Sequence, residues 1–127
     1  MVLFVILVTL MGLVVEAGAY ERKSSEENNV RIEIIPEQLG LGKQAKFNIQ
    51  MNTHSVQLSQ DMAAAAILKD DQGRKYHPLN WNGSPPGGHH RRGVLEFPVI
   101  GEMAKSVTLY IRGVANVPER IFEWKIE

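Results

Sequence analysis

Apolar and polar residues alternate through much of the chain after residue 29. Val30, Ile32 and Ile34 alternate with Arg31 and Glu33. Further apolar segments of strand length are found at residues 45–51, 65–69, 94–97, 107–111 and 121–126. A period of two places every second side chain on the same face of a strand. About seven short strands separated by turn signals predict an all-β protein, an antiparallel β-sandwich.

Two local signals refine this prediction. The stretch after Lys69 carries Gly73, which predicts a tight turn and a strand–turn–strand unit ending near Tyr76. Ser59 is a candidate N-cap, and the alanines after Met62 favour helix. We therefore expect one helical turn at about residues 61–64, followed by a strand.

The chain begins with an apolar segment. Residues 2–15 are almost wholly apolar, and Ala17-Gly18-Ala19 has the small-x-small pattern of a signal-peptidase site. The run is shorter than the roughly 20 residues of a spanning helix. Residues 1–19 are therefore expected to be a signal peptide; a retained N-terminal anchor is the alternative, because no Lys or Arg precedes the run. Either way the protein is expected to be exported: periplasmic, extracellular or anchored at the outer face of a membrane.

The remaining chain divides into two parts. Residues 20–29 are polar and charged and are expected to form a disordered tether. Residues 30–127 then form the β-sandwich domain. Residues 20–127 together are near the common size of one domain, so a single hydrophobic core is sufficient.

Composition excludes several classes of protein. The chain has no cysteine, which excludes a disulfide scaffold, a Cys-ligated zinc site and an iron–sulfur cluster. Lys plus Arg and Asp plus Glu both total 14, so no net positive charge favours nucleic acid as a partner. Contact with a membrane is expected only through an uncleaved N-terminal segment.

Histidines provide the main candidate chemistry. His89 and His90 adjoin Gly87-Gly88 in a loop rich in Gly and Pro, and His54 lies upstream. Loops at one end of a sandwich cluster in space, and neutral imidazole is a common ligand of late transition metals. We therefore predict a metal site formed by His54, His89 and His90, with Asp61 or Met62 as a fourth ligand. Copper and zinc both suit these ligands.

A second interpretation of the same residues needs no metal. His-His pairs also occur in ordinary surface loops, and the Pro85–Gly93 loop could instead contact a protein partner. Arg91 and Arg92 are expected to be solvated, as two loop arginines usually are. Trp81 is expected to pack beneath the loop.

The chain also resembles a group of uncharacterised exported prokaryotic proteins. The resemblance runs from about Val30 onward and is most specific at Thr53-His54-Ser55 and at Gly87-Gly88-His89-His90. It implies an immunoglobulin-like β-sandwich and an exported location, and in some members attachment to the membrane. It implies no activity.

Two functions follow from these features. The first is an exported, non-catalytic module that binds copper or zinc through loop histidines. The alternative is a protein–protein interaction or structural module of the cell surface that binds no metal. We do not expect an enzyme, because the sequence has no nucleophile elbow, phosphate-binding loop or cysteine nucleophile.

Overall fold

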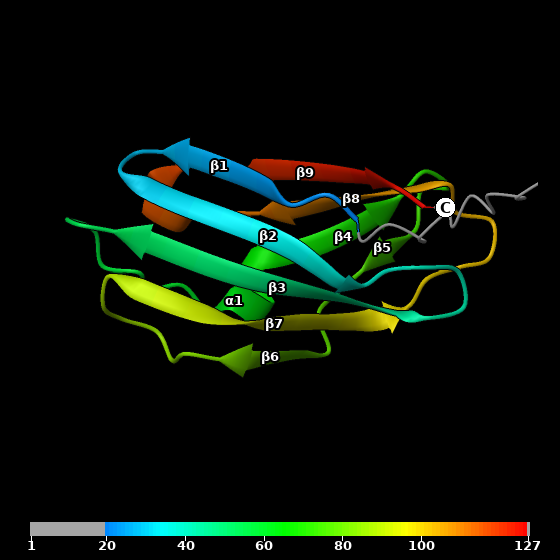
Figure 1. Ribbon diagram of the computed structural model, residues 1–127, viewed down its shortest axis with the longest axis horizontal. Helices are drawn as coiled ribbons and strands as arrows, with labels where there is room; N and C mark the ends of the chain where they lie inside the picture. Colours follow the sequence, from blue (N-terminus) through cyan, green and yellow to red (C-terminus); the bar gives the residue numbers. More distant parts are fainter. Residues whose placement is uncertain (1–19, 127) are drawn as a thin grey trace, which may run out of the picture.

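Residues 20–126 are described by the computed structural model and fold into two antiparallel β-sheets (Figure 1). The five-stranded sheet has the order β1–β2–β3–β7–β6, and the four-stranded sheet has the order β5–β4–β8–β9. The strands are β1 Lys23–Glu27, β2 Val30–Gln38, β3 Gln44–Thr53, β4 Ala66–Asp70, β5 Lys75–Tyr76, β6 Asn80–Gly83, β7 His90–Val99, β8 Ser106–Ile111 and β9 Arg120–Lys125. One helical turn, α1 (Met62–Ala65), and one 3-10 turn, η1 (Val114–Asn116), lie in the connections. The all-β prediction is confirmed.

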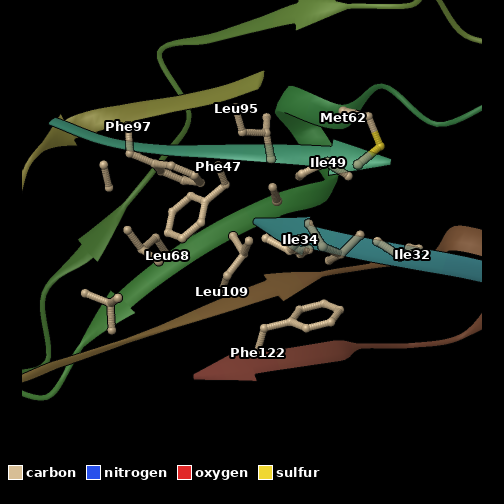
Figure 2. Close-up of a cluster of buried hydrophobic side chains, with 14 of the residues drawn as sticks. Ile32, Ile34, Phe47, Ile49, Met62, Leu68, Leu95, Phe97, Leu109 and Phe122 are labelled. Carbon is tan, nitrogen blue, oxygen red and sulfur yellow. The ribbon is translucent and has the colours of Figure 1, made fainter. Parts of the chain in front are cut away.

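The hydrophobic core lies between the two sheets, where the alternation places it. The inward residues of β2 and β3 are fully buried and face those of β4, β8 and β9 (Figure 2). Phe47 is central: its ring centroid lies 5.8 Å from that of Phe97 and 5.2 Å from that of Trp124. Such aromatic pairs add to the stabilisation from burial itself. Polar side chains are left on the outer face of the five-stranded sheet.

The structure corrects the expectation that residues 20–29 form a disordered tether. They contain β1, which pairs with β2 from Lys23↔Ile34 to Glu27↔Val30. Asn28 and Asn29, both with positive φ (49° and 64°), form the two-residue hairpin turn between them. The sequence predicted a tether because β1 has no apolar side chain; its pairing with β2 rests on backbone hydrogen bonds.

Three further details differ from the expectations. Asp61, not Ser59, is the N-cap of α1, because its carboxylate accepts hydrogen bonds from the amides of Ala63 and Ala64. Strand β7 begins at His90 and continues past Pro98, which lies where the β3–β7 register shifts. Residues 20–126 contain nine strands instead of about seven, β1 and β6 being the additions.

A buried arginine joins the two sheets where β1 lies beside β9 (Figure 1). Arg120 is 2% exposed, and its guanidinium donates to the carbonyl oxygens of Val30 (2.9 Å) and Glu27 (2.9 Å). It also contacts Ser25 Oγ at 3.2 Å and the Val114 carbonyl oxygen at 3.5 Å. The β1–β2 hairpin is thereby fastened to β9 and η1.

No helix within residues 20–126 has the length and apolar character needed to cross a membrane. The predicted signal peptide or anchor at residues 1–19 lies outside the described residues.

Candidate functional site

Pairing of β3 with β7 brings the two histidine segments to the same end of the five-stranded sheet. Asn52 is the register partner of His90, and the Thr53 amide donates to the His89 carbonyl oxygen at 3.0 Å. His54 follows directly as β3 ends. We call this region, residues 26–31, 52–55 and 87–92, the histidine end.

A polar row crosses four neighbouring strands at the histidine end. The register places Glu26, Arg31, Asn52 and His90 side by side on β1, β2, β3 and β7. All four are exposed. Asn52 Oδ1 lies 2.8 Å from His90 Nδ1. An amide oxygen can only accept, so this contact is a hydrogen bond in the tautomer with the proton on Nδ1, and that tautomer presents Nε2 as an acceptor or ligand atom.

Arg31 supplies the positive charge of this row. Its guanidinium donates to Glu33 Oε1 through Nε (2.9 Å) and Nη2 (2.7 Å), and it lies 3.4 Å from Glu26 Oε2. The hydrogen bonds to Glu33, followed by the charge of that residue, raise the pKa of Arg31. Two donors that converge on one carboxylate oxygen also restrict the guanidinium orientation. The row therefore presents fixed donors and acceptors.

A polar pocket of about 370 Å³ lies beside the row. The β1–β2 hairpin lines it with Glu26, Asn29 and Arg31, and the end of β3 lines it with residues 52–55. His54 is exposed at this pocket. The pocket can accept a small polar group of a partner and offers it both charges and several hydroxyl and amide groups.

The loop before β7 is held to the segment that precedes α1. The Gly87 amide donates to the Leu58 carbonyl (2.8 Å), and the Leu58 amide donates to the Gly88 carbonyl (3.0 Å). Gly87 and Gly88 have φ values of 116° and 75°, conformations that glycine adopts readily. His89 is thus carried by a loop with defined backbone partners.

Arg91 lies behind this loop and reinforces it. Only 3% of Arg91 is exposed, and its guanidinium donates to the carbonyl oxygens of Leu58 (3.0 Å), Gln60 (2.7 Å) and Ser84 (3.1 Å). Burial lowers the pKa of Arg91, and the carboxylate of Asp61 opposes that shift. The expectation that Arg91 is solvated was therefore wrong, while Arg92 is exposed as expected.

Trp81 covers the same region from β6. Its ring lies 5.8 Å from the Arg91 guanidinium, and its indole nitrogen donates to the Ser84 carbonyl at 2.9 Å. A Cβ on Gly93 would lie 2.7 Å from the ring, and one on Gly83 would lie 2.9 Å from it. Both glycines therefore allow the ring to lie flat over the strands. Trp81 is partly buried against the core, the packing role expected for it.

The four predicted metal ligands have different surroundings. His54, His89 and His90 lie at the histidine end, whereas Asp61 caps α1 with Oδ1. In residues 20–126 no group of three or more His, Asp or Glu side chains is placed to hold a metal ion. The predicted four-ligand set is thus not assembled. Met62, the alternative fourth ligand, is fully buried in the core.

Sequence reasoning overlooked the residues that organise this end. Asn52 and Arg31 occupy outward positions of β3 and β2, as the alternation of apolar and polar residues predicts. The sequence does not show that these two residues lie in one row with His90. Arg91 alternates with Gly93 and Leu95 on the inward face of β7, which was the available signal for its burial. Comparisons of the chain with protein-family models, curated proteins and solved structures find no match.

Proposed function

We propose that this chain is an exported, non-catalytic binding module of the immunoglobulin-like β-sandwich type, and that it contacts a protein partner through the histidine end. One observation carries the proposal. The row Glu26–Arg31–Asn52–His90 borders a polar pocket, and its side chains are already bonded in two pairs, Arg31 to Glu26 and His90 to Asn52.

Preorganisation is what makes this surface suitable for binding. Side chains that are held before association lose less conformational entropy when a partner arrives. The backbone bonds of Gly87 and Leu58 and the buried Arg91 fix the adjoining loop in the same way. The apolar run at residues 2–15 and the small-residue site after it support export and hence a role at the cell surface.

A screen of wild-type protein on arrays of peptides and glycans tests the proposal. We expect peptide ligands whose affinity falls about tenfold, or about 1.4 kcal/mol, in Asn52→Ala and His90→Ala. Lys46→Ala, on the same sheet away from the histidine end, is the matched control and retains full affinity. Absence of peptide binding, or equal losses in all three variants, would refute a binding role for this end.

A transition-metal ion is a second candidate ligand. This candidate is supported by the backbone bond from Thr53 to His89, which joins the segments that carry His54 and His89, and by the bond from His90 Nδ1 to Asn52, which leaves Nε2 available. Imidazole nitrogens suit copper and zinc, and water would complete the coordination. In this proposal Asp61 is not a ligand, because its carboxylate caps α1.

Calorimetric titration with Cu(II), Cu(I) and Zn(II) tests the metal proposal. We expect binding of at least one of these ions, lost in the triple variant His54→Ala, His89→Ala, His90→Ala and retained in Asp61→Asn. His77→Ala, which removes an exposed histidine next to β5, serves as the control for nonspecific imidazole binding. Equal affinity of the triple variant and the wild type would eliminate the site.

A further inference from the structure

The edge strand β6 differs from the other sheet edges. In the part of the chain that the structure describes, the edges are β1, β6, β5 and β9. β1 and β9 carry charged residues and face each other, and β5 has two residues preceded by Arg74. β6, Asn80-Trp81-Asn82-Gly83, carries no charge, and in Figure 1 it is the outermost strand of its sheet. Proteins usually protect edge strands with charge, proline or cover, because free backbone groups there pair with other chains.

The free backbone groups of β6 can be assigned from its pairing with β7. Ser84 N donates to Arg92 O at 3.0 Å, so Ser84 and, two residues before it, Asn82 turn their main-chain groups to β7; at the other end of β6 the Leu79 amide donates to the Glu96 carbonyl oxygen at 2.7 Å. Trp81 and Gly83, which flank Asn82, therefore direct their amide and carbonyl groups away from the sheet. Each offers one donor and one acceptor.

We propose that two copies of this chain associate through β6, pairing antiparallel about a twofold axis at Asn82. In this register Trp81 of one copy faces Gly83 of the other, and the four outward amides donate to the four outward carbonyls. The two five-stranded sheets then form one continuous sheet whose polar outer faces lie on the same side.

The side chains of β6 fit a second copy. Opposite each Trp81 ring lies a glycine, so the ring meets no side chain across the interface. Leu79, which is 60% exposed, comes opposite Pro85 of the partner copy. Pro85 has no amide hydrogen and therefore ends the hydrogen-bonded pairing there. Asn82, whose side-chain amide donates to Glu96 Oε1 on β7 at 3.1 Å, faces its own counterpart.

Cysteine cross-linking tests the register directly, because the natural chain has no cysteine. The two Asn82 positions form a non-hydrogen-bonded pair with Cα atoms about 4.5 Å apart, close enough for a disulfide. Oxidation of Asn82→Cys with diamide is expected to give a covalent dimer. Asn80→Cys is the matched control: its two copies lie about 13 Å apart along the strands and are expected to stay uncross-linked.

Sedimentation equilibrium tests the association without a cross-link. We expect wild-type protein to dimerise with increasing concentration in the presence of a chelator. Asn82→Lys, which places two like charges opposite each other, is expected to remain monomeric. Gln50→Lys on the same face of central strand β3 is expected to dimerise as the wild type does. Monomeric wild-type protein at all concentrations, equal cross-linking of the two cysteine variants, or unaltered dimerisation of Asn82→Lys would each overturn the proposal.

Discussion

Arg120→Met lowers the free energy of unfolding by about 3–5 kcal/mol, the largest effect expected for a single substitution in this chain. The side chain is fully buried, and its guanidinium donates hydrogen bonds to the carbonyl oxygens of Val30 and Glu27, both at 2.9 Å. Methionine keeps much of the apolar contact but removes both of these hydrogen bonds. A hydrogen bond to a charged group contributes about 1.5–3 kcal/mol.

Thermal and urea denaturation measure this effect. For a domain of this size about 1 kcal/mol corresponds to roughly 4–8 °C in Tm, so the variant is expected to melt at least about 12 °C lower. Arg112→Met, at an exposed position one strand away, is the control and is expected to change stability by less than about 0.5 kcal/mol. Similar Tm values for the two variants would show that Arg120 does not join the sheets as described.

Arg91→Met has the second largest expected effect, about 2–4 kcal/mol, and its consequences are concentrated at the histidine end. The guanidinium of Arg91 supplies donors to Leu58, Gln60 and Ser84, which belong to the two segments beside His89. Loss of these donors removes the hydrogen bond to the Gln60 carbonyl oxygen, and it removes one of two donors from the carbonyl oxygens of Leu58 and Ser84. Arg91→Lys is expected to restore only part of the stability, because an ammonium group lacks the planar fork that reaches several acceptors.

Hydrogen exchange separates this local effect from general destabilisation. The amides of Leu58 and Gly87, which bond across the two segments, are expected to exchange faster in Arg91→Met under conditions where amides of β8 remain protected. Arg92→Met, the exposed neighbour, is the control and is expected to leave both amides unchanged. Unchanged protection of Leu58 and Gly87 in Arg91→Met would contradict the role given to Arg91.

Alternation of apolar residues predicts the strands that form the core. It identified β2, β3, β8 and β9, because each buries every second side chain, and Gly73 correctly marked the β4–β5 turn. The alternation did not predict the edge strands β1 and β6. β1 has polar residues on both faces, and Asn82-Gly83 in β6 has the composition of a turn.

The candidate site was less predictable than the fold. Pairing of β3 with β7 brings His54 and the His89–His90 pair to one end of the sheet. The sequence predicted this proximity, because loops at one end of a sandwich cluster in space. Strand alternation places Arg91 and Arg120 on inward faces, but the hydrogen-bond partners of their guanidinium groups could not be inferred from the sequence. The acceptors are backbone carbonyl groups of segments distant in the sequence. Every residue has such a group, so the sequence does not indicate which ones bind the arginines. Within residues 20–126 neither guanidinium forms an ion pair with a carboxylate.

The proposed function and the proposed dimer bear on the same sheet. Binding at the histidine end uses the end of the five-stranded sheet, whereas β6 lies along its edge, so both contacts can exist together. A pair of copies would then present two histidine ends on one continuous polar face.

Amide chemical-shift mapping with a peptide selected from the array tests the central claim most directly. We predict that the perturbed amides fall within residues 26–31, 52–55 and 87–92, and that His90→Ala needs about ten times as much peptide to reach the same perturbation. Perturbations confined to β4, β5, β8 or β9, with residues 52–55 and 87–92 unaffected, would contradict the claim that the histidine end is the binding surface.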